Sequence, residues 1–125
     1  MISGIGFDIV EVERIRNVLQ HRRDRFLKRV FADHEVIYAM RKRKPEIHLA
    51  AGFAAKEAFL KAIGVGLGRG VSMNEVAVVH EASGKSSLTL IGEANVVVQR
   101  LKIGRIYLSL SHTEQYATAI VILET

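Results

Sequence analysis

The sequence predicts an α+β fold in which a mainly antiparallel sheet is packed with a long central helix. Three observations lead to this prediction. The chain opens with a strand-like alternating segment, its middle is a long alanine-rich helical segment, and its second half holds two pairs of strand-like segments joined by short polar turns. The resulting order of strand, helices, hairpin, helix and hairpin is typical of α+β proteins.

Residues 2–10 alternate as a strand whose two faces differ in bulk. One face carries Ile5, Phe7 and Ile9, and the other carries Gly4, Gly6, Asp8 and Val10. The two glycines beside Asp8 would leave room above the sheet for a ligand. Glycines in strands equally mark a bulge or close backbone packing, so both interpretations stay open.

The helical spacing of apolar residues predicts three helical segments between the first strand and residue 40. A first helix is expected over about 11–19, followed by a short helical piece over about 26–30. A third helix is expected to run through Met40, with Asp33 as its N-cap.

The long central helix is predicted over about 47–63, and the only proline, Pro45, separates it from the preceding helix. Gly64 is expected to close it in a left-handed turn. The run of alternating glycines at residues 64–70 would let backbone N–H groups approach a phosphate, or it is only a flexible turn.

The second half is predicted to contain four strands and one helix. The strands are expected at 75–80, 87–91, 105–111 and 116–124, and the helix at 93–102. No repeat or low-complexity tract interrupts the chain, so residues 1–125 are expected to form a single domain.

Composition narrows the classes of function. The 125 residues include 18 Lys plus Arg against 13 Asp plus Glu, and the basic residues cluster in 14–29 and 41–44. Basic surfaces of this kind attract a negatively charged partner, which could be an acidic protein, nucleic acid or anionic lipid. The plainer alternative is a solvated basic helix that has no partner. With no cysteine, a bound metal would be a hard cation such as Mg2+. Because neither a basic leader nor a membrane-length apolar run is found, we expect a soluble cytoplasmic protein.

Three charged residues are candidates for a cation and phosphate site. Asp8 is a lone acid in an apolar strand, and Glu57 lies four residues before Lys61 on the central helix. Two such carboxylates suit a metal ion, while the ammonium suits a phosphate oxygen. The plainer alternative is an exposed Glu57–Lys61 ion pair worth about 0.3–0.5 kcal/mol.

Hydroxyl and imidazole groups gather at the end of one predicted strand, in Ser109-Leu110-Ser111-His112-Thr113. They are better interpreted as donors to a phosphate than as a nucleophile, because no G-x-S-x-G elbow surrounds the serines. The other histidines lack the spacing of a zinc site.

Taken together, three ordered segments resemble the holo-[acyl-carrier-protein] synthase family of 4′-phosphopantetheinyl transferases. They are Gly6-Phe7-Asp8-Ile9-Val10-Glu11-Val12-Glu13-Arg14-Ile15, Phe53-Ala54-Ala55-Lys56-Glu57-Ala58-Phe59-Leu60-Lys61-Ala62-Ile63-Gly64-Val65-Gly66 and Ser109-Leu110-Ser111-His112-Thr113. The resemblance also takes in Phe26-Leu27-Lys28-Arg29-Val30-Phe31 with Glu35 and spans nearly the whole chain.

The resemblance implies a transferase of fatty acid biosynthesis. Such an enzyme moves the phosphopantetheine arm of coenzyme A to a serine of apo acyl carrier protein and releases adenosine 3′,5′-bisphosphate. It also implies Mg2+ and a homotrimer with coenzyme A in clefts between subunits, and no nucleic acid or membrane partner.

The resemblance further assigns roles to individual residues. Asp8 and Glu57 would bind the metal, with Lys61 on the pyrophosphate as a third catalytic residue. Ser111 and His112 would lie near the nucleotide phosphates, and Gly64 would help to bind coenzyme A. A metal-bound water or Glu57 itself would take the serine proton.

Carrier proteins of this kind are strongly acidic, which gives the basic helix a specific role. The docking candidates are Arg14, Arg22, Arg23, Arg25 and Lys28. The chain departs from the family's usual pattern over residues 73–86. Two rival functions are a nucleic-acid-binding module, disfavoured by the few aromatic residues, and an inactive scaffold of the same fold.

Overall fold

The computed structural model describes the backbone of residues 1–125 and every side chain except that of Val65. It confirms the expected α+β class. The elements, in chain order, are β1 (Ile2–Glu11), α1 (Val12–Val30), α2 (Asp33–Met40), α3 (Pro45–Ile63), α4 (Val65–Gly68), the 3-10 helix η1 (Met73–Glu75), β2 (Val76–His80), β3 (Ser86–Leu90), α5 (Gly92–Arg100), β4 (Arg105–His112) and β5 (Tyr116–Glu124).

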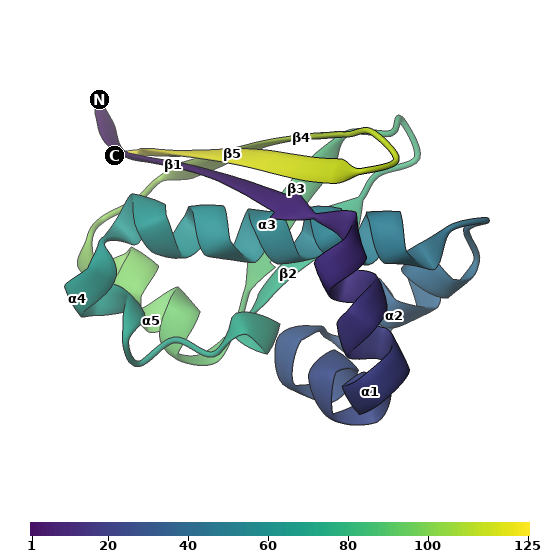
Figure 1. The fold of residues 1–125 in the computed structure, drawn as a ribbon. Coiled ribbons are helices and arrows are strands. Elements are labelled where there is room, and N and C mark those ends of the chain that lie inside the picture. Colours follow the sequence, from purple (N-terminus) through teal and green to yellow (C-terminus); the bar gives the residue numbers. More distant parts are fainter.

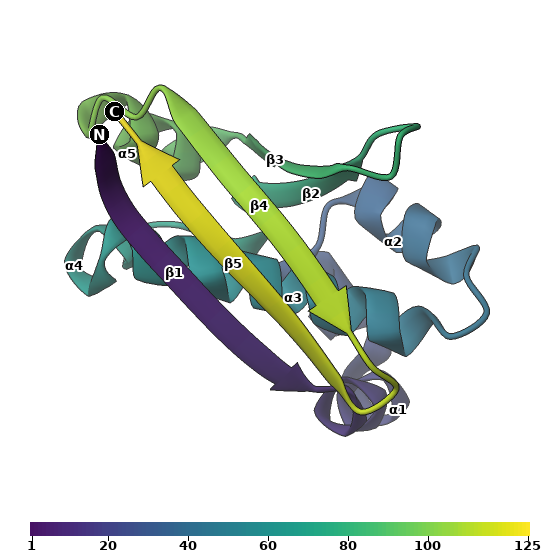
Figure 2. The same cartoon turned by 90° about the horizontal axis from the view of Figure 1, so that it is seen from above.

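The main sheet has three antiparallel strands in the order β1-β5-β4, so the first strand of the chain pairs with the last. Helix α3 lies against one face of this sheet, mostly under β1 and β5, as Figures 1 and 2 show. The hairpin of β2 and β3 forms a second, two-stranded sheet, which approaches the main sheet at β4. The two edges of the main sheet, β1 and β4, therefore lie on opposite sides of α3.

The core is built around α3, whose small residues allow close packing. Six alanines of this helix are buried or nearly so, and Ala50, Ala54, Ala55 and Ala58 are fully inaccessible. Larger side chains such as Phe59 and Leu49 fill the space toward the other elements. Alanine combines high helix propensity with little bulk, which explains why this segment is a long helix that its neighbours approach closely.

Strand β1 touches the backbone of α3 directly, and this contact settles one question that the sequence left open. A Cβ at Gly6 would lie 1.7 Å from the carbonyl oxygen of Ala58, and one at Gly4 would lie 2.2 Å from that of Ala62. The expectation of room for a ligand above these glycines is therefore wrong. The alternative of close backbone packing is confirmed, because helix α3 occupies that space.

Several predicted helix boundaries also need correction. Residues 12–30 form one helix with a kink at Arg22 (φ −143°, ψ 39°) instead of two separate pieces, and the kink lets both Ile15 and Val30 reach the core. Asp33 is the first residue of α2 and not its N-cap. The cap is Ala32, whose backbone N–H donates to the Glu35 carboxylate at 2.9 Å.

The end of the central helix is close to the expectation. Gly64 has a φ of +93°, and its N–H donates to the carbonyl oxygens of Leu60 at 3.1 Å and Lys61 at 3.3 Å. The glycine-rich segment that follows is not simply a loop, because Val65–Gly68 forms the short helix α4. Among the helices of the described chain, none has the length and apolar character needed to cross a membrane.

Candidate functional site

Asp8 and Lys61 meet at the β1 edge of the main sheet. The Lys61 Nζ atom lies 2.8 Å from Asp8 Oδ1 and also donates to the Phe7 carbonyl oxygen at 3.1 Å. The Asp8 side chain is 15% exposed and the Lys61 side chain 54%. A largely enclosed carboxylate is thus balanced by a half-exposed ammonium.

Glu57 stands one helical turn from Lys61 on the same stripe of α3 and is half-buried. The opposed directions of β1 and α3 place Gly4 at Ala62 and Gly6 at Ala58, so Asp8 lies level with the turn of α3 that precedes Ala58. Among the ion pairs of the described residues, Lys61 pairs with Asp8 and not with Glu57. The plainer interpretation of a Glu57–Lys61 surface ion pair is therefore not what the structure contains.

The donors at this edge fit a hard cation that keeps much of its water. Among the described side chains there is no cluster of three or more His, Cys, Asp or Glu residues of the kind that encloses a metal completely. Mg2+ typically binds one or two carboxylates together with waters and substrate phosphates. Lys61 already supplies a positive charge to Asp8, and displacing this half-exposed ammonium costs little, since such pairs contribute about 0–1 kcal/mol.

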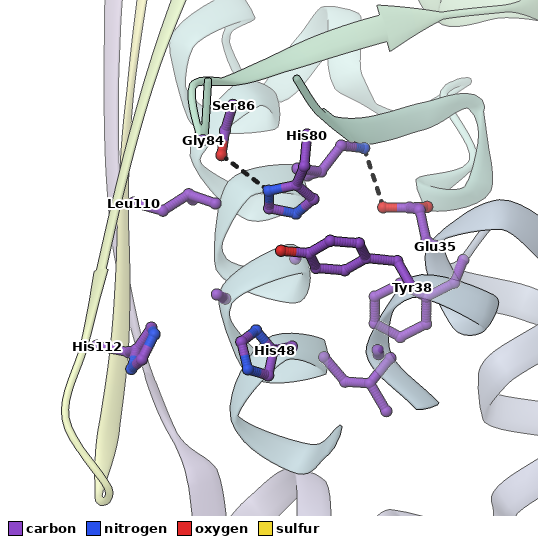
Figure 3. Close-up of a pocket in the computed structure, with 14 residues that line it drawn as sticks. Glu35, Tyr38, His48, His80, Gly84, Ser86, Leu110 and His112 are labelled. Carbon is purple, nitrogen blue, oxygen red and sulfur yellow. Dashed lines mark hydrogen bonds between the residues drawn. The ribbon is translucent and has the colours of Figure 1, made fainter. Parts of the chain in front are cut away.

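A second polar region lies across α3, at the β4 edge of the sheet, where a pocket of about 190 Å3 is found (Figure 3). His112 from β4 and His48 from α3 line it on one side, and their rings contact edge to face at 5.6 Å. Tyr38 from α2 and His80 from β2 line the other side. These two rings stack nearly parallel, 4.0 Å apart at an interplanar angle of 7°.

Beneath this pocket a buried ion pair connects three elements. The Lys56 Nζ atom is 2.7 Å from Glu35 Oε1 and donates to the Val76 carbonyl oxygen at 2.5 Å, and the Lys56 side chain is fully buried. The second Glu35 oxygen accepts the Val78 N–H at 3.0 Å. Burial lowers the pKa of Lys56, whereas the Glu35 carboxylate opposes this change. Each of these buried nitrogen and oxygen atoms has a hydrogen-bond partner, so the ion pair fixes α2 and β2 against α3.

The structure does not bring Ser111 and His112 to the same place within one chain. Successive residues of β4 point to opposite faces of the sheet. His112 lines the pocket beside α3, whereas Ser111 is exposed beside Thr118 on the other face. Gly64 lies at the far end of α3 from His48 and His112, so it does not contact this pocket.

The five docking candidates are all exposed on α1. Arg22 and Arg25 line a groove of about 280 Å3 together with Arg29, and the floor of this groove is apolar: Val18, Phe26 and Val30. Arg14 lies four residues before Val18, on the same helical stripe. Arg23 turns instead toward α2, where it contacts the Met40 sulfur at 3.4 Å. Lys28 is exposed next to the groove, and its carbonyl oxygen accepts from Asn74.

Sequence reasoning singled out His112 but missed the other aromatic residues that line the pocket. Tyr38, His48 and His80 were not singled out, because they come from three different elements and no spacing links them. Glu35 and Lys56 both belong to the segments of the family resemblance, but the contact between them was not predicted. A glutamate and a lysine within otherwise apolar helical faces were the only available signal, and such residues are usually exposed.

Comparison with known proteins supports the family suggested by the motifs. Residues 4–121 match the model of the 4′-phosphopantetheinyl transferase superfamily. A holo-[acyl-carrier-protein] synthase from Koribacter versatilis is 47% identical over 124 residues, which cover 99% of each chain. One from Syntrophus aciditrophicus is 39% identical, covering 99% of this chain and 97% of the relative.

Solved structures agree with these sequence relatives. The holo-[acyl-carrier-protein] synthase of Neisseria meningitidis has a TM-score of 0.89 at 33% identity and full coverage of both chains. That of Bacillus anthracis, in complex with CoA (3′,5′-ADP), has a TM-score of 0.81 at 34% identity, covering 100% of this chain and 98% of that one. This chain belongs to the 4′-phosphopantetheinyl transferase superfamily.

Proposed function

We propose that this protein transfers the 4′-phosphopantetheine group of coenzyme A to a serine of apo acyl carrier protein. The relatives named above are holo-[acyl-carrier-protein] synthases, and the Bacillus anthracis structure is a complex with CoA (3′,5′-ADP). The observation that carries the proposal is the contact of Lys61 with Asp8 at 2.8 Å on the edge where both motifs converge.

In this reaction the serine oxygen forms a bond to the β-phosphorus of coenzyme A. The bond from that phosphorus to the oxygen of the α-phosphate breaks, and adenosine 3′,5′-bisphosphate leaves with the electron pair. Negative charge develops on the phosphate oxygens, where Lys61 would hold it. Glu57 is the candidate in this chain to receive the serine proton.

Asp8 and Glu57 are the residues that would hold Mg2+. When bound, the ion supplies charge neutralisation at the diphosphate, which is typical of phosphoryl transfer. Two carboxylates leave most of its coordination positions to water and phosphate oxygens. The ammonium of Lys61, which contacts Asp8 Oδ1 at 2.8 Å, is the group of this chain that would contact a phosphate oxygen.

The function is tested by incubating the protein with coenzyme A, Mg2+ and apo acyl carrier protein and weighing the carrier. An added phosphopantetheine on the carrier serine supports the transferase. An unchanged carrier mass, together with tight salt-sensitive binding of nucleic acid, would favour the binding-module alternative. An unchanged mass without nucleic-acid binding would favour an inactive scaffold.

The groove on α1 suits an acidic helix of the carrier. Its rim of arginines would attract acidic side chains, and its apolar floor would accept a hydrophobic residue of the partner. Arg14 lies closest in sequence to β1 and hence to Asp8, so its contact would orient the carrier serine toward the reacting phosphate.

Reversing the charge of Arg14 is expected to affect only one of the two substrates. Arg14→Glu should raise the KM for the carrier protein by about tenfold or more, while the KM for coenzyme A changes little. Arg100→Glu, at an exposed site on α5, serves as the matched control. Equal effects of Arg14→Glu on both KM values would remove this residue from the carrier site.

We further propose that the protein works as a homotrimer. The outer face of the main sheet exposes apolar residues that a monomer would leave in water, with Ile5 59%, Phe7 55% and Ile9 56% exposed. The candidate cation site and the His112 pocket lie at opposite edges of the sheet, with α3 between them. One coenzyme A that touches both sets would therefore need the second set from a neighbouring copy.

A charge placed in this apolar face should prevent assembly. The native protein is expected to sediment at three times the 13.9 kDa protomer mass. Phe7→Glu should sediment as a monomer, because burying an unpaired carboxylate in an interface is costly. Ile91→Glu, at another exposed apolar site, should leave assembly intact. A native protein that is monomeric at micromolar concentration would contradict the trimer.

A cytoplasmic location also stays a prediction, for which cell fractionation is the test.

A further inference from the structure

The ammonium of Lys61 is shared between oxygen atoms of two neighbouring residues on β1. Its Nζ atom donates to Asp8 Oδ1 at 2.8 Å and to the Phe7 carbonyl oxygen at 3.1 Å. Asp8 is also one of the two carboxylates proposed above to hold Mg2+. The same carboxylate therefore serves two cations, one that belongs to the chain and one that comes from solution.

The backbones that carry Asp8 and Lys61 are held at a fixed separation. Strand β1 packs directly on α3 (Figures 1 and 2), and a Cβ at Gly6 would lie 1.7 Å from the Ala58 carbonyl oxygen. Moving the strand away from the helix would break this packing. A second cation at Asp8 is therefore accommodated by the Lys61 side chain, because its four-carbon stem is flexible.

Lys61 pairs with Asp8 although another carboxylate is within reach. Glu57 lies four residues before Lys61, which is the favourable order for an ion pair on a helix. Among the ion pairs of the described residues, however, Lys61 has Asp8 as its partner, and Glu57 has none. The Asp8 side chain is only 15% exposed, so its charge is less screened by water and attracts a cation more strongly.

The charges at this edge suit a divalent cation only in part. Asp8 and Glu57 carry two negative charges, and Lys61 offsets one of them. An ion that binds Asp8 is repelled by the ammonium already in contact with that carboxylate. The diphosphate of coenzyme A changes this balance, because its negative charge attracts the ammonium and the divalent ion alike.

We propose that Lys61 competes with the divalent cation for Asp8, and that the diphosphate of coenzyme A relieves this competition. This inference rests on the proposed function, which supplies the cation and coenzyme A. Its consequence is cooperative binding: the cation binds weakly to the protein alone and more tightly when the diphosphate offers Lys61 another anionic partner. Lys61 then links the loading of the cation site to the presence of the substrate.

The exposure of Lys61 sets the size of the expected effect. Its side chain is 54% exposed, and ion pairs of this kind change an equilibrium constant by up to about fivefold. Removing the ammonium should therefore tighten the binding of a divalent cation by about threefold to fivefold in the absence of coenzyme A. A lysine that only helped to shape the site would give the opposite result when removed.

Titration of the full-length protein with Mn2+, followed by the EPR signal of the ion in solution, tests the competition. Mn2+ prefers the same oxygen ligands as Mg2+. Lys61→Met should bind Mn2+ more tightly than the native protein, whereas Lys61→Arg, which keeps the charge, should not. Lys102→Met is the matched control, because it removes one lysine charge at an exposed site after α5 and should leave Mn2+ affinity unchanged.

The same titration at saturating coenzyme A tests the relief of the competition, after subtraction of the Mn2+ that coenzyme A binds in solution. The advantage of Lys61→Met should disappear, so that the native protein binds Mn2+ at least as tightly as the variant. By linkage, Mn2+ should tighten coenzyme A binding to the native protein by the factor by which coenzyme A tightens Mn2+ binding. Lys61→Gln provides a second neutral variant, and thermal unfolding verifies that each variant is folded.

Two results would overturn the proposal. One is a folded Lys61→Met protein that binds Mn2+ no more tightly than the native protein without coenzyme A. The other is an advantage of this variant that persists in full with coenzyme A, which would mean that the diphosphate does not engage Lys61. Either result, together with a carrier that gains phosphopantetheine, would reject the competition and keep the transferase. The expected Mn2+ affinities with an unmodified carrier would reject the transferase and keep the competition.

Discussion

Replacing Asp8 with asparagine is expected to reduce kcat/KM for phosphopantetheine transfer by about a thousandfold. The amide keeps the shape of the side chain and removes the negative charge that would hold Mg2+, which corresponds to a loss of about 4 kcal/mol in the transition state. Glu57→Gln should have an effect of similar size. Both are measured as initial rates over a series of Mg2+ concentrations.

Stability should respond far less than activity to these two substitutions. The partner of Asp8 is a half-exposed lysine, and pairs of this kind contribute about 0–1 kcal/mol. The Tm of Asp8→Asn should therefore lie within about 5 °C of the native value. Asp33→Asn, at an exposed position on α2, is the control and should retain full activity. If both Asp8→Asn and Glu57→Gln stay active at saturating Mg2+, neither residue belongs to the metal site.

The second large effect concerns folding. Gly6→Ala should destabilise the protein by about 3 kcal/mol or more, because the new methyl group would lie 1.7 Å from the Ala58 carbonyl oxygen and 2.9 Å from the Ala62 nitrogen. Both contacts are with backbone, so no side-chain rotation relieves them and α3 itself must move away from β1. Thermal unfolding should show a Tm lower by about 10 °C or more.

Gly66→Ala is the matched control for this substitution. Its added methyl group would meet no atom within 4 Å, and position 66 lies within helix α4, where alanine is favoured over glycine. We therefore expect an unchanged or slightly higher Tm. A Gly6→Ala protein as stable as the native one would contradict the direct contact of strand and helix.

Local sequence patterns were sufficient to predict most of the fold. The alternation of β1 and the alanine content of α3 both act within a few residues, and both elements are confirmed. The kink at Arg22 was not predicted, because it depends on tertiary packing. Ile15 and Val30, on either side of the kink, are both buried in the core. Likewise, nothing in the sequence alone distinguishes glycines that make room for a ligand from glycines that make room for a helix.

The candidate site was predicted in part, for a related reason. Asp8, Glu57 and Lys61 belong to compact motifs, so their spacing pointed to them, and the structure places Asp8 against Lys61. Their roles in metal and phosphate binding stay predictions. The imidazole pocket was invisible because His48, His80 and Tyr38 are brought together only by tertiary packing.

The buried ammonium of Lys56 has a further effect on its neighbour. Consecutive residues of an α-helix are turned by about 100° from one another. With Lys56 anchored inside the protein by Glu35 and the Val76 carbonyl oxygen, α3 is unable to roll about its long axis. Glu57 is thereby obliged to project beside the sheet edge. Deleting one residue from the preceding turn would bring Ala58 into that place, and inserting one would bring Lys56 there, so the helix is expected to tolerate changes of side chain far better than changes of length.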